Sequence, residues 1–250
     1  MDTPRTAVVT GAAGEIGRAI CAALLSGGHR VVAVDRSADA LDEAFAGVAG
    51  DAVRTCCIDL GEADAAQRID SAVPSGWAGV DILVNNAAIS PKQNGKTSGL
   101  AELSLQEWNE VLLVNTTVPM LLARHWVPSM ARRGWGRVVN ISSRAGRSQA
   151  NAAGPSYMTS KAAILGLTRS IASEFANRGV TANAVAPGLV STHMTRQLSE
   201  DMYAAICSRI PMARTGQPAE IAAAVAFLAS DGAGYVTGAC LDVNGGAFMT

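Results

Sequence analysis

The 250-residue sequence has little charge and few aromatic residues: 16% of its residues are charged, 4% are aromatic, and the formal net charge is −1. So small a charge excess gives no basic surface that would attract a polyanion, and we expect no nucleic-acid partner. The sequence also lacks an apolar run of about 18 residues, the length that a membrane helix needs, and shows no signal segment before its first apolar run. It therefore predicts neither membrane insertion nor export and favours a cytoplasmic location.

Cysteine and histidine are also sparse. The five cysteines form no C-x-x-C pair and are odd in number, so neither a zinc site nor a disulfide framework is indicated, and we expect reduced thiols. The three histidines, His29, His125 and His193, are scattered and form no ligand set with nearby carboxylates. The sequence predicts no metal site.

Apolar residues, by contrast, make up 49% of the chain and gather in short runs that alternate with helical segments. The strand-like runs span residues 6–10, 30–35, 53–58, 81–85, 137–142, 181–186 and 239–243. This alternation predicts an α/β fold: a doubly wound parallel sheet of about seven strands with helices on both faces, in one domain covering residues 1–250. In such a sheet, ligands bind outside the carboxyl ends of the strands.

Residues 10–17, with the sequence TGAAGEIG, follow the first apolar run and open a helical segment. The unpaired N–H groups at the start of a helix, together with the helix dipole, favour a phosphate anion. Gly11 and Gly17 are expected to allow close approach of backbone and ligand, and Gly14 to adopt a positive φ. The alternative is a simple glycine-rich turn between a strand and a helix.

A second apolar run ends in Asp35, eighteen positions after Gly17. A carboxylate at the end of the second strand of such a unit accepts the hydroxyl hydrogens of the adenosine ribose and repels a 2′-phosphate. The sequence therefore favours NAD over NADP, although Arg36 could pair with a phosphate and soften this preference. Asp35 could instead cap a helix that starts at Ser37, and the two roles are compatible.

Tyr157 and Lys161 lie one turn apart on one face of a long helical segment. A phenol has a pKa of about 10 in water, so it needs a nearby cation to act as a base near neutral pH. The ammonium of Lys161 is predicted to lower the pKa of Tyr157 by roughly 2 to 3, and an oxidised nicotinamide would lower it further. The alternative is an ordinary amphipathic tyrosine beside a solvated lysine.

Together these motifs resemble the short-chain dehydrogenase/reductase family over essentially the whole chain. The resemblance implies that residues 10–17 bind the phosphates, that Asp59 and Leu60 flank the adenine, that residues 85–87 support the sheet beside the cofactor, and that residues 187–192 hold the nicotinamide carboxamide. The full set of cofactor contacts it implies is Gly11, Ala13, Gly14, Glu15, Ile16, Gly17, Asp35, Arg36, Asp59, Leu60, Asn86, Ala87, Tyr157, Lys161, Pro187, Gly188, Val190 and Thr192.

The same resemblance implies the catalytic residues. Tyr157 would be the general acid/base, Lys161 would lower its pKa and bind the nicotinamide ribose, and Ser143 would polarise the substrate oxygen. Asn115 resembles the family asparagine that holds a water connecting Lys161 to solvent; its alternative is a helix asparagine that is satisfied within the protein.

The sequence departs from the family pattern in places. In the family, the catalytic serine usually lies thirteen residues before the tyrosine, and this chain has Arg144 there. Ser143 lies fourteen residues before Tyr157, so we infer one inserted residue between them. We prefer Ser143 over its neighbour Ser142. An arginine cannot accept a proton or act as a neutral donor. Ala88 also stands where the family more often has glycine. Ser104 and Glu107 are predicted to form a capping box, which is a structural role.

The predicted reaction is reversible hydride transfer between NAD(H) and a secondary alcohol or ketone. Arg144, Arg147 and His193 are candidate contacts for a small polar or anionic substrate; the alternative is solvated surface charge. Two other functions remain open: an NADPH-dependent 3-oxoacyl-[acyl-carrier-protein] reductase, and a non-catalytic nucleotide-binding scaffold. Family analogy further implies a homotetramer.

Overall fold

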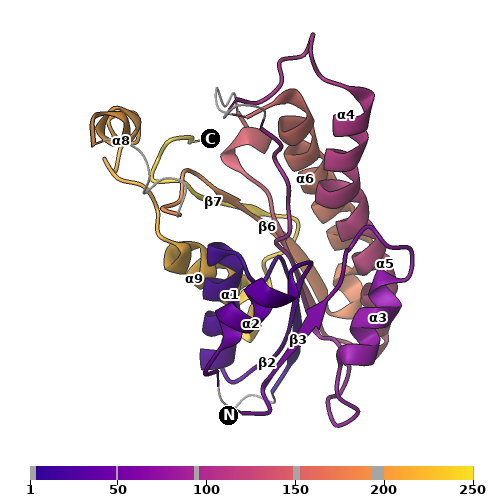
Figure 1. Ribbon diagram of the computed structural model, residues 1–250. Helices are drawn as coiled ribbons and strands as arrows, with labels where there is room; N and C mark the ends of the chain where they lie inside the picture. Colours follow the sequence, from indigo (N-terminus) through magenta and orange to yellow (C-terminus); the bar gives the residue numbers. More distant parts are fainter. Residues whose placement is uncertain (1–3, 49, 93–95, 149–152, 193–199, 250) are drawn as a thin grey trace.

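The computed structural model describes residues 4–48, 50–92, 96–148, 153–192 and 200–249. Its described residues form one sheet of seven parallel strands in the order β3-β2-β1-β4-β5-β6-β7 (Figure 1). The strands are β1 (Thr6–Thr10), β2 (Arg30–Asp35), β3 (Val53–Cys57), β4 (Ile82–Asn85), β5 (Gly136–Ile141), β6 (Val180–Pro187) and β7 (Cys240–Val243). Each lies within one residue of a predicted run, so the predicted fold class is confirmed.

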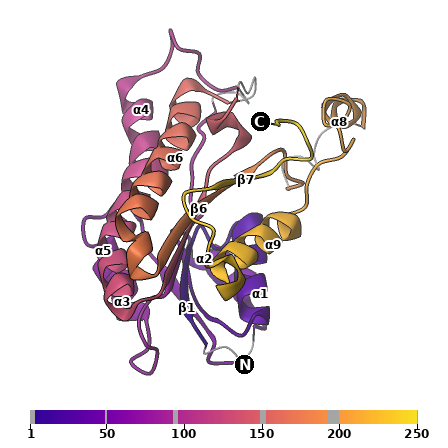
Figure 2. The same ribbon diagram turned by 180° about the vertical axis from the view of Figure 1, so that it is seen from behind.

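Helices cover both faces of the sheet (Figures 1 and 2). The α-helices are α1 (Glu15–Ser26), α2 (Ala38–Phe45), α3 (Ala65–Ala72), α4 (Leu105–Leu112), α5 (Val118–Arg133), α6 (Pro155–Phe175), α8 (Glu200–Cys207) and α9 (Pro218–Ala229). Short turns of other helix types are η1 (Leu113–Thr117), η2 (Arg144–Gly146), η3 (Ala176–Arg178) and η4 (Asp231–Ala233). Helices α1, α2 and α9 lie on one face, and α3, α5 and α6 on the other.

The side chains of the strands point alternately to the two faces of the sheet and form two separate hydrophobic cores. In β1, Ala7 and Val9 pack toward α1 and α9, whereas Val8 packs toward α3 and α5. All three are fully buried because successive side chains of a strand point to opposite faces. This double burial explains why the strands are continuously apolar rather than alternating with polar residues.

The strand order reverses between β1 and β4, which pair directly with each other although β2 and β3 separate them in the sequence. Crossover helices leave in opposite directions at such a point, and the carboxyl ends of the strands there border the crevice in which ligands of such sheets bind. The predicted cofactor and catalytic residues lie at and beyond the carboxyl ends of β1 to β6 and in η1 and α6, around this crevice. Among the described residues, no helix is long and apolar enough to cross a membrane.

Candidate active site

The loop between β1 and α1 is shaped by two glycines. Gly11 has φ +63°, and a Cβ on it would lie 2.9 Å from Ala87 Cα, so it allows close contact between the loops after β1 and β4. A Cβ on Gly17 would lie only 2.1 Å from the carbonyl oxygen of Gly11. The prediction for Gly14 is wrong: this N-cap of α1 has φ −69°, because the left-handed turn occurs at Gly11 instead.

Asp35 is bonded to this loop. One carboxylate oxygen accepts a hydrogen bond from the Ala13 N–H at 3.1 Å, and the other accepts one from the Arg36 N–H at 2.8 Å. The proposed helix-capping role belongs to Ser37, whose hydroxyl accepts from the Ala40 N–H at 3.2 Å and which is the N-cap of α2. Asp35 therefore holds the glycine loop and presents a carboxylate at the end of β2.

A cavity of about 170 Å³ opens beside Asp35. Its walls come from the ends of β1, β2, β3 and β4 and from the start of η1. The residues that line it are Gly11, Asp35, Arg36, Ile58, Asp59, Leu60, Ala87, Ala88, Ile89 and Val114. Five segments that are distant in sequence thus meet where the sequence predicted the adenosine half of a dinucleotide.

Thr10 joins the loops after β1 and β4. Its hydroxyl oxygen accepts hydrogen bonds from the backbone N–H groups of Asn86 and Ala87, both at 3.0 Å. The amide group of Asn86 donates in return to the carbonyl oxygens of Thr10 and Gly11. Sequence reasoning placed Thr10 in the loop without a role, because this role depends on a partner in another strand.

The two serines after β5 point in different directions. Ser142 is buried, and its hydroxyl donates to the carbonyl oxygen of Lys161 at 2.8 Å. Ser143 lies close enough to the Tyr157 hydroxyl to lower the pKa of Tyr157 by hydrogen bonding. The Ser143 hydroxyl oxygen also accepts from the Ala145 N–H at 3.1 Å, which fixes its orientation. The geometry therefore associates Ser143, and not Ser142, with the tyrosine hydroxyl.

Lys161 is 3% exposed, and its Nζ donates to the carbonyl oxygen of Ile141 at 2.7 Å. The same nitrogen lies 5.6 Å from the centre of the Tyr157 ring. Burial lowers the pKa of Lys161 to about 8 and raises the pKa of Tyr157, while the hydrogen bond with Ser143 acts to lower the latter. The sequence predicted that the protein lowers the pKa of Tyr157, and for the protein without cofactor this prediction is wrong. Desolvation raises this pKa by more than the hydrogen bond with Ser143 lowers it.

Asn115 lies in η1, a π-helical turn between α4 and α5 in which the Val118 N–H bonds to the Leu113 carbonyl. Its side chain accepts from the Ile89 N–H at 2.8 Å and donates to the Ile89 carbonyl and to the Ser160 hydroxyl. The Asn115 side chain is therefore satisfied within the protein. It joins the segment after β4 to the helix that carries Tyr157.

Sequence reasoning missed Gly146. A Cβ on this residue would lie 2.4 Å from the carbonyl oxygen of Lys161, so η2 packs directly against α6. It also missed a buried amide chain in which Asn85 donates to Asn140 at 2.8 Å and Asn140 donates to Thr168 at 2.9 Å. In the sequence, Gly146 is only one glycine among many, and Asn85 and Asn140 are only polar residues within apolar runs. Neither observation shows which residue is the partner.

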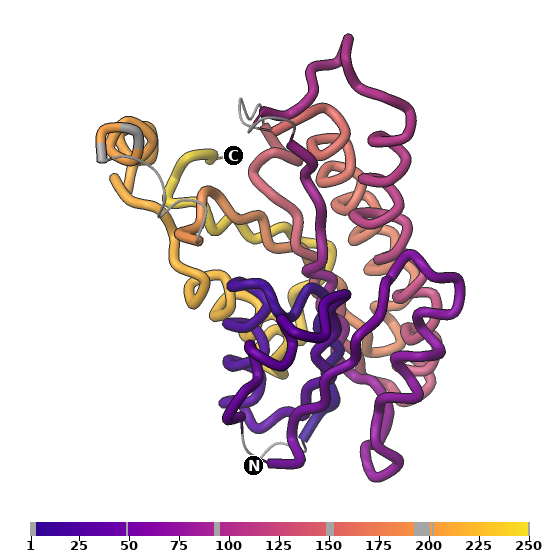
Figure 3. The backbone as a smooth tube through the Cα atoms, in the orientation of Figure 1, coloured from indigo at the N-terminus to yellow at the C-terminus, as the bar shows by residue number. Residues whose placement is uncertain are grey.

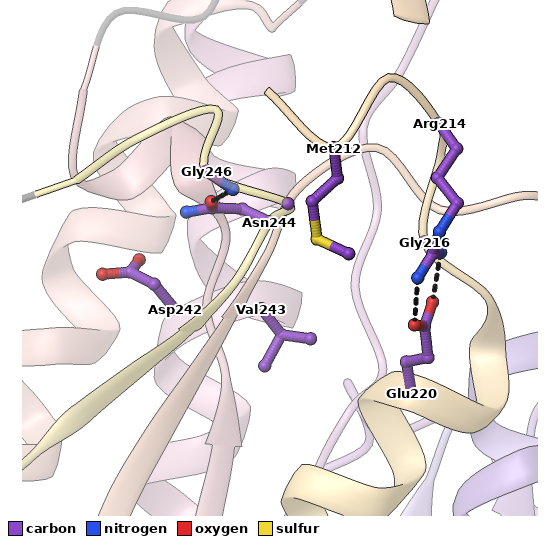
Figure 4. Close-up of a pocket in the computed structure, with 9 residues that line it drawn as sticks. Met212, Arg214, Gly216, Glu220, Asp242, Val243, Asn244 and Gly246 are labelled. Atoms are coloured by element: carbon purple, nitrogen blue, oxygen red, sulfur yellow. Dashed lines mark hydrogen bonds and ion pairs between the residues drawn. The ribbon is translucent and has the colours of Figure 1, made fainter. Parts of the chain in front are cut away.

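At the end of β6, Pro187 and Gly188 lie beside the end of β7, and the chain then runs beside Gly216. A Cβ on Gly188 would lie 2.8 Å from Asn244 Cα, and the Ser191 N–H donates to the Gly216 carbonyl at 2.7 Å. A cavity of about 330 Å³ lies next to this segment (Figure 4). One of its walls is braced by Arg214 and Glu220, which make two hydrogen bonds at 2.6 and 2.8 Å. Thr192 is the last described residue here, and His193 lies outside the described residues.

The predicted substrate contacts receive little support. Arg147 pairs with Asp242 of β7, and its guanidinium lies 5.0 Å from the centre of the Phe248 ring. This ion pair fastens the end of η2 to β7 and gives Arg147 a structural role. Arg144 begins η2, where its carbonyl accepts from the Ser148 N–H at 3.0 Å.

These features define an NAD(P)-dependent oxidoreductase that acts on CH–OH or keto groups. The strand order reverses at a crevice, a glycine loop is tied to an acidic strand end, and a serine, a tyrosine and a lysine meet at the same edge of the sheet. The close approaches at Gly11 and Gly17 pack the glycine loop against the loop after β4 and onto the start of α1, which a side chain at either position would prevent.

The chain belongs to the short-chain dehydrogenase/reductase family. A family model described as enoyl-(acyl carrier protein) reductase matches residues 11–247. A 3-oxoacyl-[acyl-carrier-protein] reductase from Vibrio cholerae is 36% identical over 245 residues, with 98% of each chain covered. Nodulation protein G from Azospirillum brasilense is 37% identical over 247 residues, with 97% of each chain covered.

Solved structures agree with this assignment. A 3-oxoacyl-[acyl-carrier protein] reductase from Brucella melitensis has a TM-score of 0.92 and 33% identity, covering 98% of this chain and 92% of that one. A second reductase structure from Brucella melitensis, with bound NAD, has a TM-score of 0.89 and 33% identity over the same shares. A protein described as an NAD(P)-dependent gluconate 5-dehydrogenase from Beutenbergia cavernae, with NADP at low occupancy, has a TM-score of 0.87 and 38% identity, covering 97% of this chain and 96% of that one.

Proposed function

We propose that this enzyme transfers hydride reversibly between NAD(H) and a secondary alcohol or ketone of a small polar substrate, with Tyr157 as general acid/base. The observation that supports it most directly is the meeting of Ser143, Tyr157 and Lys161 across the crevice from the phosphate loop. The nicotinamide supplies the hydride chemistry when it is bound. The side chains position the substrate and move its proton.

The protein residues have distinct roles in this proposal. The Ser143 hydroxyl binds the substrate oxygen, and the Tyr157 hydroxyl gives or takes its proton. Lys161 is held by the Ile141 carbonyl and places a cation beside the tyrosine. Because burial raises the tyrosine pKa, the positive charge of an oxidised nicotinamide in the same site would favour the phenolate during alcohol oxidation.

The proposed cofactor is NAD, with NADP less favoured. Asp35 supports this preference because its carboxylate stands at the edge of the adenosine cavity, where it would repel a 2′-phosphate. Arg36 lines the same cavity and could reduce the discrimination. The similar structures contain NAD in one case and NADP in another, so the charge at Asp35 is the feature to test.

The remaining proposed cofactor contacts are supported by their position. Gly11, Asp59, Leu60 and Ala87 line the cavity, and Ala13 bonds to Asp35. Gly14 lies at the N-terminus of α1, and its first turn contains Glu15, Ile16 and Gly17. Asn86 follows β4, and Pro187, Gly188, Val190 and Thr192 lie at and beyond the end of β6.

Tyr157→Phe tests the proposal. We expect it to bind NADH normally, measured by nucleotide fluorescence, and to lose at least about 100-fold in kcat, because general acid/base catalysis typically contributes that much or more. Gluconate oxidation and acetoacetyl-thioester reduction, each assayed with both nicotinamide cofactors, provide the turnover measurements. Undiminished turnover by Tyr157→Phe would contradict the proposal and favour a role in which the tyrosine takes no part.

A second candidate is a 3-oxoacyl-[acyl-carrier-protein] reductase that uses NADPH. Its support is the similarity to the reductases of Vibrio cholerae and Brucella melitensis. The carboxylate of Asp35 is unfavourable for NADPH. Faster turnover of the acetoacetyl thioester with NADPH than with NADH would favour this candidate, whereas nucleotide binding without turnover on any alcohol or ketone would favour the scaffold.

We also propose a single-domain, cytoplasmic homotetramer. Exposed apolar residues near the edge strand β7 support self-association: Phe227 is 49% exposed, Leu241 is 40% exposed and Tyr235 is fully exposed. Light scattering of the purified protein at working concentration tests this assembly. A monomer would contradict it.

A further inference from the structure

The segment between β4 and α4 packs against the start of α6, close to Tyr157. Figure 3 shows the two parts of the chain running beside each other. Gly154, the buried N-cap of α6, is so close to this segment that a Cβ on it would lie 3.2 Å from Thr97 Cβ. Tyr157 follows three residues later in the same helix. The contact therefore lies where it can determine the position of the tyrosine hydroxyl.

The carboxylate of Glu107 links three parts of the chain at this contact. One oxygen accepts from the Ser98 hydroxyl at 2.8 Å, and the other accepts from the Ser156 hydroxyl at 3.4 Å. The backbone N–H of Glu107 donates to the Ser104 hydroxyl at 3.1 Å, which anchors the residue in the first turn of α4. The predicted capping box is therefore only half formed, because the carboxylate turns to Ser98 and Ser156.

The environment favours a carboxylate at this place. Ser156 is 2% exposed and directly precedes Tyr157, and the N-cap of α6 provides no side-chain hydrogen bond. A negative group beside the N-terminus of a helix is stabilised by the helix dipole. Hydrogen bonds to an ionised acceptor are also shorter and stronger than neutral ones. A single half-buried side chain can thus hold two helices and one loop together.

We propose that Glu107 is a positioning residue: by bridging Ser98 and Ser156 it fixes the start of α6, and with it the Tyr157 hydroxyl, against the segment after β4. This rests on the proposed function, since it takes Tyr157 as the acid/base. Glu107 itself touches neither substrate nor cofactor. Its loss should reduce the rate of proton transfer while leaving the phosphate loop and Asp35 in place.

Glu107→Ala, Glu107→Gln and the control Glu110→Ala test this role in the full-length protein. Glu110 is an exposed carboxylate on the same helix, which makes it a matched control. For Glu107→Ala we expect kcat to fall by about 10-fold or more, because small misplacements of reacting groups have large effects on rate, with the KM for NAD unchanged. Amide hydrogen exchange should become faster in residues 156–160 and stay unchanged in α1.

Glu107→Gln should restore most of kcat and the slow exchange. A glutamine amide can accept from one serine hydroxyl and donate to the other. Glu110→Ala should behave as the unmodified protein. Wild-type kcat and exchange in Glu107→Ala would overturn the inference, and so would a parallel loss of nucleotide affinity with faster exchange throughout α1 and α6.

Tyr157→Phe, assayed beside these variants, separates the two proposals. If Tyr157→Phe keeps its turnover, the proposed function fails. If Tyr157→Phe loses turnover but Glu107→Ala loses neither rate nor protection, only the inference about Glu107 fails. The exchange measurement needs no substrate, so it reads the position of α6 independently of activity.

Discussion

The proposed nucleotide end of the crevice, around Gly11, Gly17 and Asp35, is shaped by backbone. The proposed catalytic end, around Tyr157 and Lys161, is shaped by side chains. At the nucleotide end, the carbonyl of Gly11 approaches Gly17 at a distance that permits no Cβ. At the catalytic end, the Lys161 ammonium bonds to the Ile141 carbonyl, and Asn115 bonds to Ser160. The first end depends on the absence of side chains, and the second on their chemical groups.

The functional side chains are also buried to different extents at the two ends of the crevice. Lys161 is almost fully buried, and desolvation alters the pKa values of both Lys161 and Tyr157. Asp35 lies partly exposed at the edge of its cavity, bonded to main-chain amides. Added volume should therefore damage the nucleotide end most, and changes in charge or alignment should damage the catalytic end most. Three predictions test this distinction.

The largest effect is expected for Gly17→Ala. Its Cβ would lie 2.1 Å from a backbone oxygen and 2.8 Å from Ala12 Cα, so the phosphate loop must move. We expect a loss of about 3 kcal/mol in the free energy of unfolding, at the upper end for overpacking, and weakened NADH binding. Denaturant unfolding and fluorescence titration measure these effects.

Gly76→Ala is the control for this change, since Gly76 is exposed, lies outside the proposed cofactor contacts, and a Cβ on it would meet nothing within 4 Å. It should bind NADH within a few-fold of the unmodified protein. If both variants lost nucleotide affinity equally, the close approach at Gly17 would not be the cause.

Gly146→Ala should impair the catalytic end of the crevice and leave the nucleotide end unchanged. A Cβ 2.4 Å from the Lys161 carbonyl would push η2 away from α6 and displace Ser143. We expect kcat to fall by about 10- to 100-fold while NADH affinity stays unchanged, because the displaced groups are catalytic. Steady-state kinetics and fluorescence titration measure the two quantities.

The matched control is Gly166→Ala on the exposed side of α6, where a Cβ meets nothing within 4 Å. It should keep its activity and gain about 0.5 to 1 kcal/mol of stability, since alanine is the better helix former. A fall in NADH affinity as large as the fall in kcat for Gly146→Ala would refute the separation.

The smallest effect concerns pH and Lys161. Its pKa falls from 10.5 when exposed to about 8 in the folded protein, so between these pH values the unfolded chain binds more protons. Stability relative to Lys161→Met should therefore rise with pH across this window, by on the order of 1 to 2 kcal/mol, and the contribution is lost as the pH falls through about 8. Denaturant unfolding of both proteins at several pH values measures the difference. A constant difference would show that Lys161 is not desolvated by folding.

Local patterns were sufficient for most of the fold. The strand boundaries were predicted within one residue because a parallel strand buried on both faces is a continuous apolar run, which ends where the chain reaches solvent. Asp35, Ser143 and Tyr157 could be assigned to the crevice because they follow strands or begin a helix at its edge. The glycine loop was recognised, but the positive φ was assigned to Gly14 instead of Gly11, since sequence does not show which glycine makes the turn.

Several side chains have partners that are distant in the sequence and could not be predicted from it. Arg147 pairs with Asp242, 95 residues away. Glu107 was read as half of a capping box, but its carboxylate reaches Ser156, 49 residues away. The prediction for the pKa of Tyr157 counted the charges of Lys161 and of an oxidised nicotinamide but left out burial, which raises this pKa in the protein itself.

The sequence by itself determined the order of the elements, the glycine loop and the residue types that can carry hydride-transfer chemistry, because these depend on hydrophobic periodicity and on local spacing. Only the tertiary structure decided which groups meet: Thr10 with Asn86, Gly146 with Lys161, Glu107 with Ser156. The physical reason is that hydrogen bonding, ion pairing and desolvation depend on distances between atoms, and packing of the chain sets those distances.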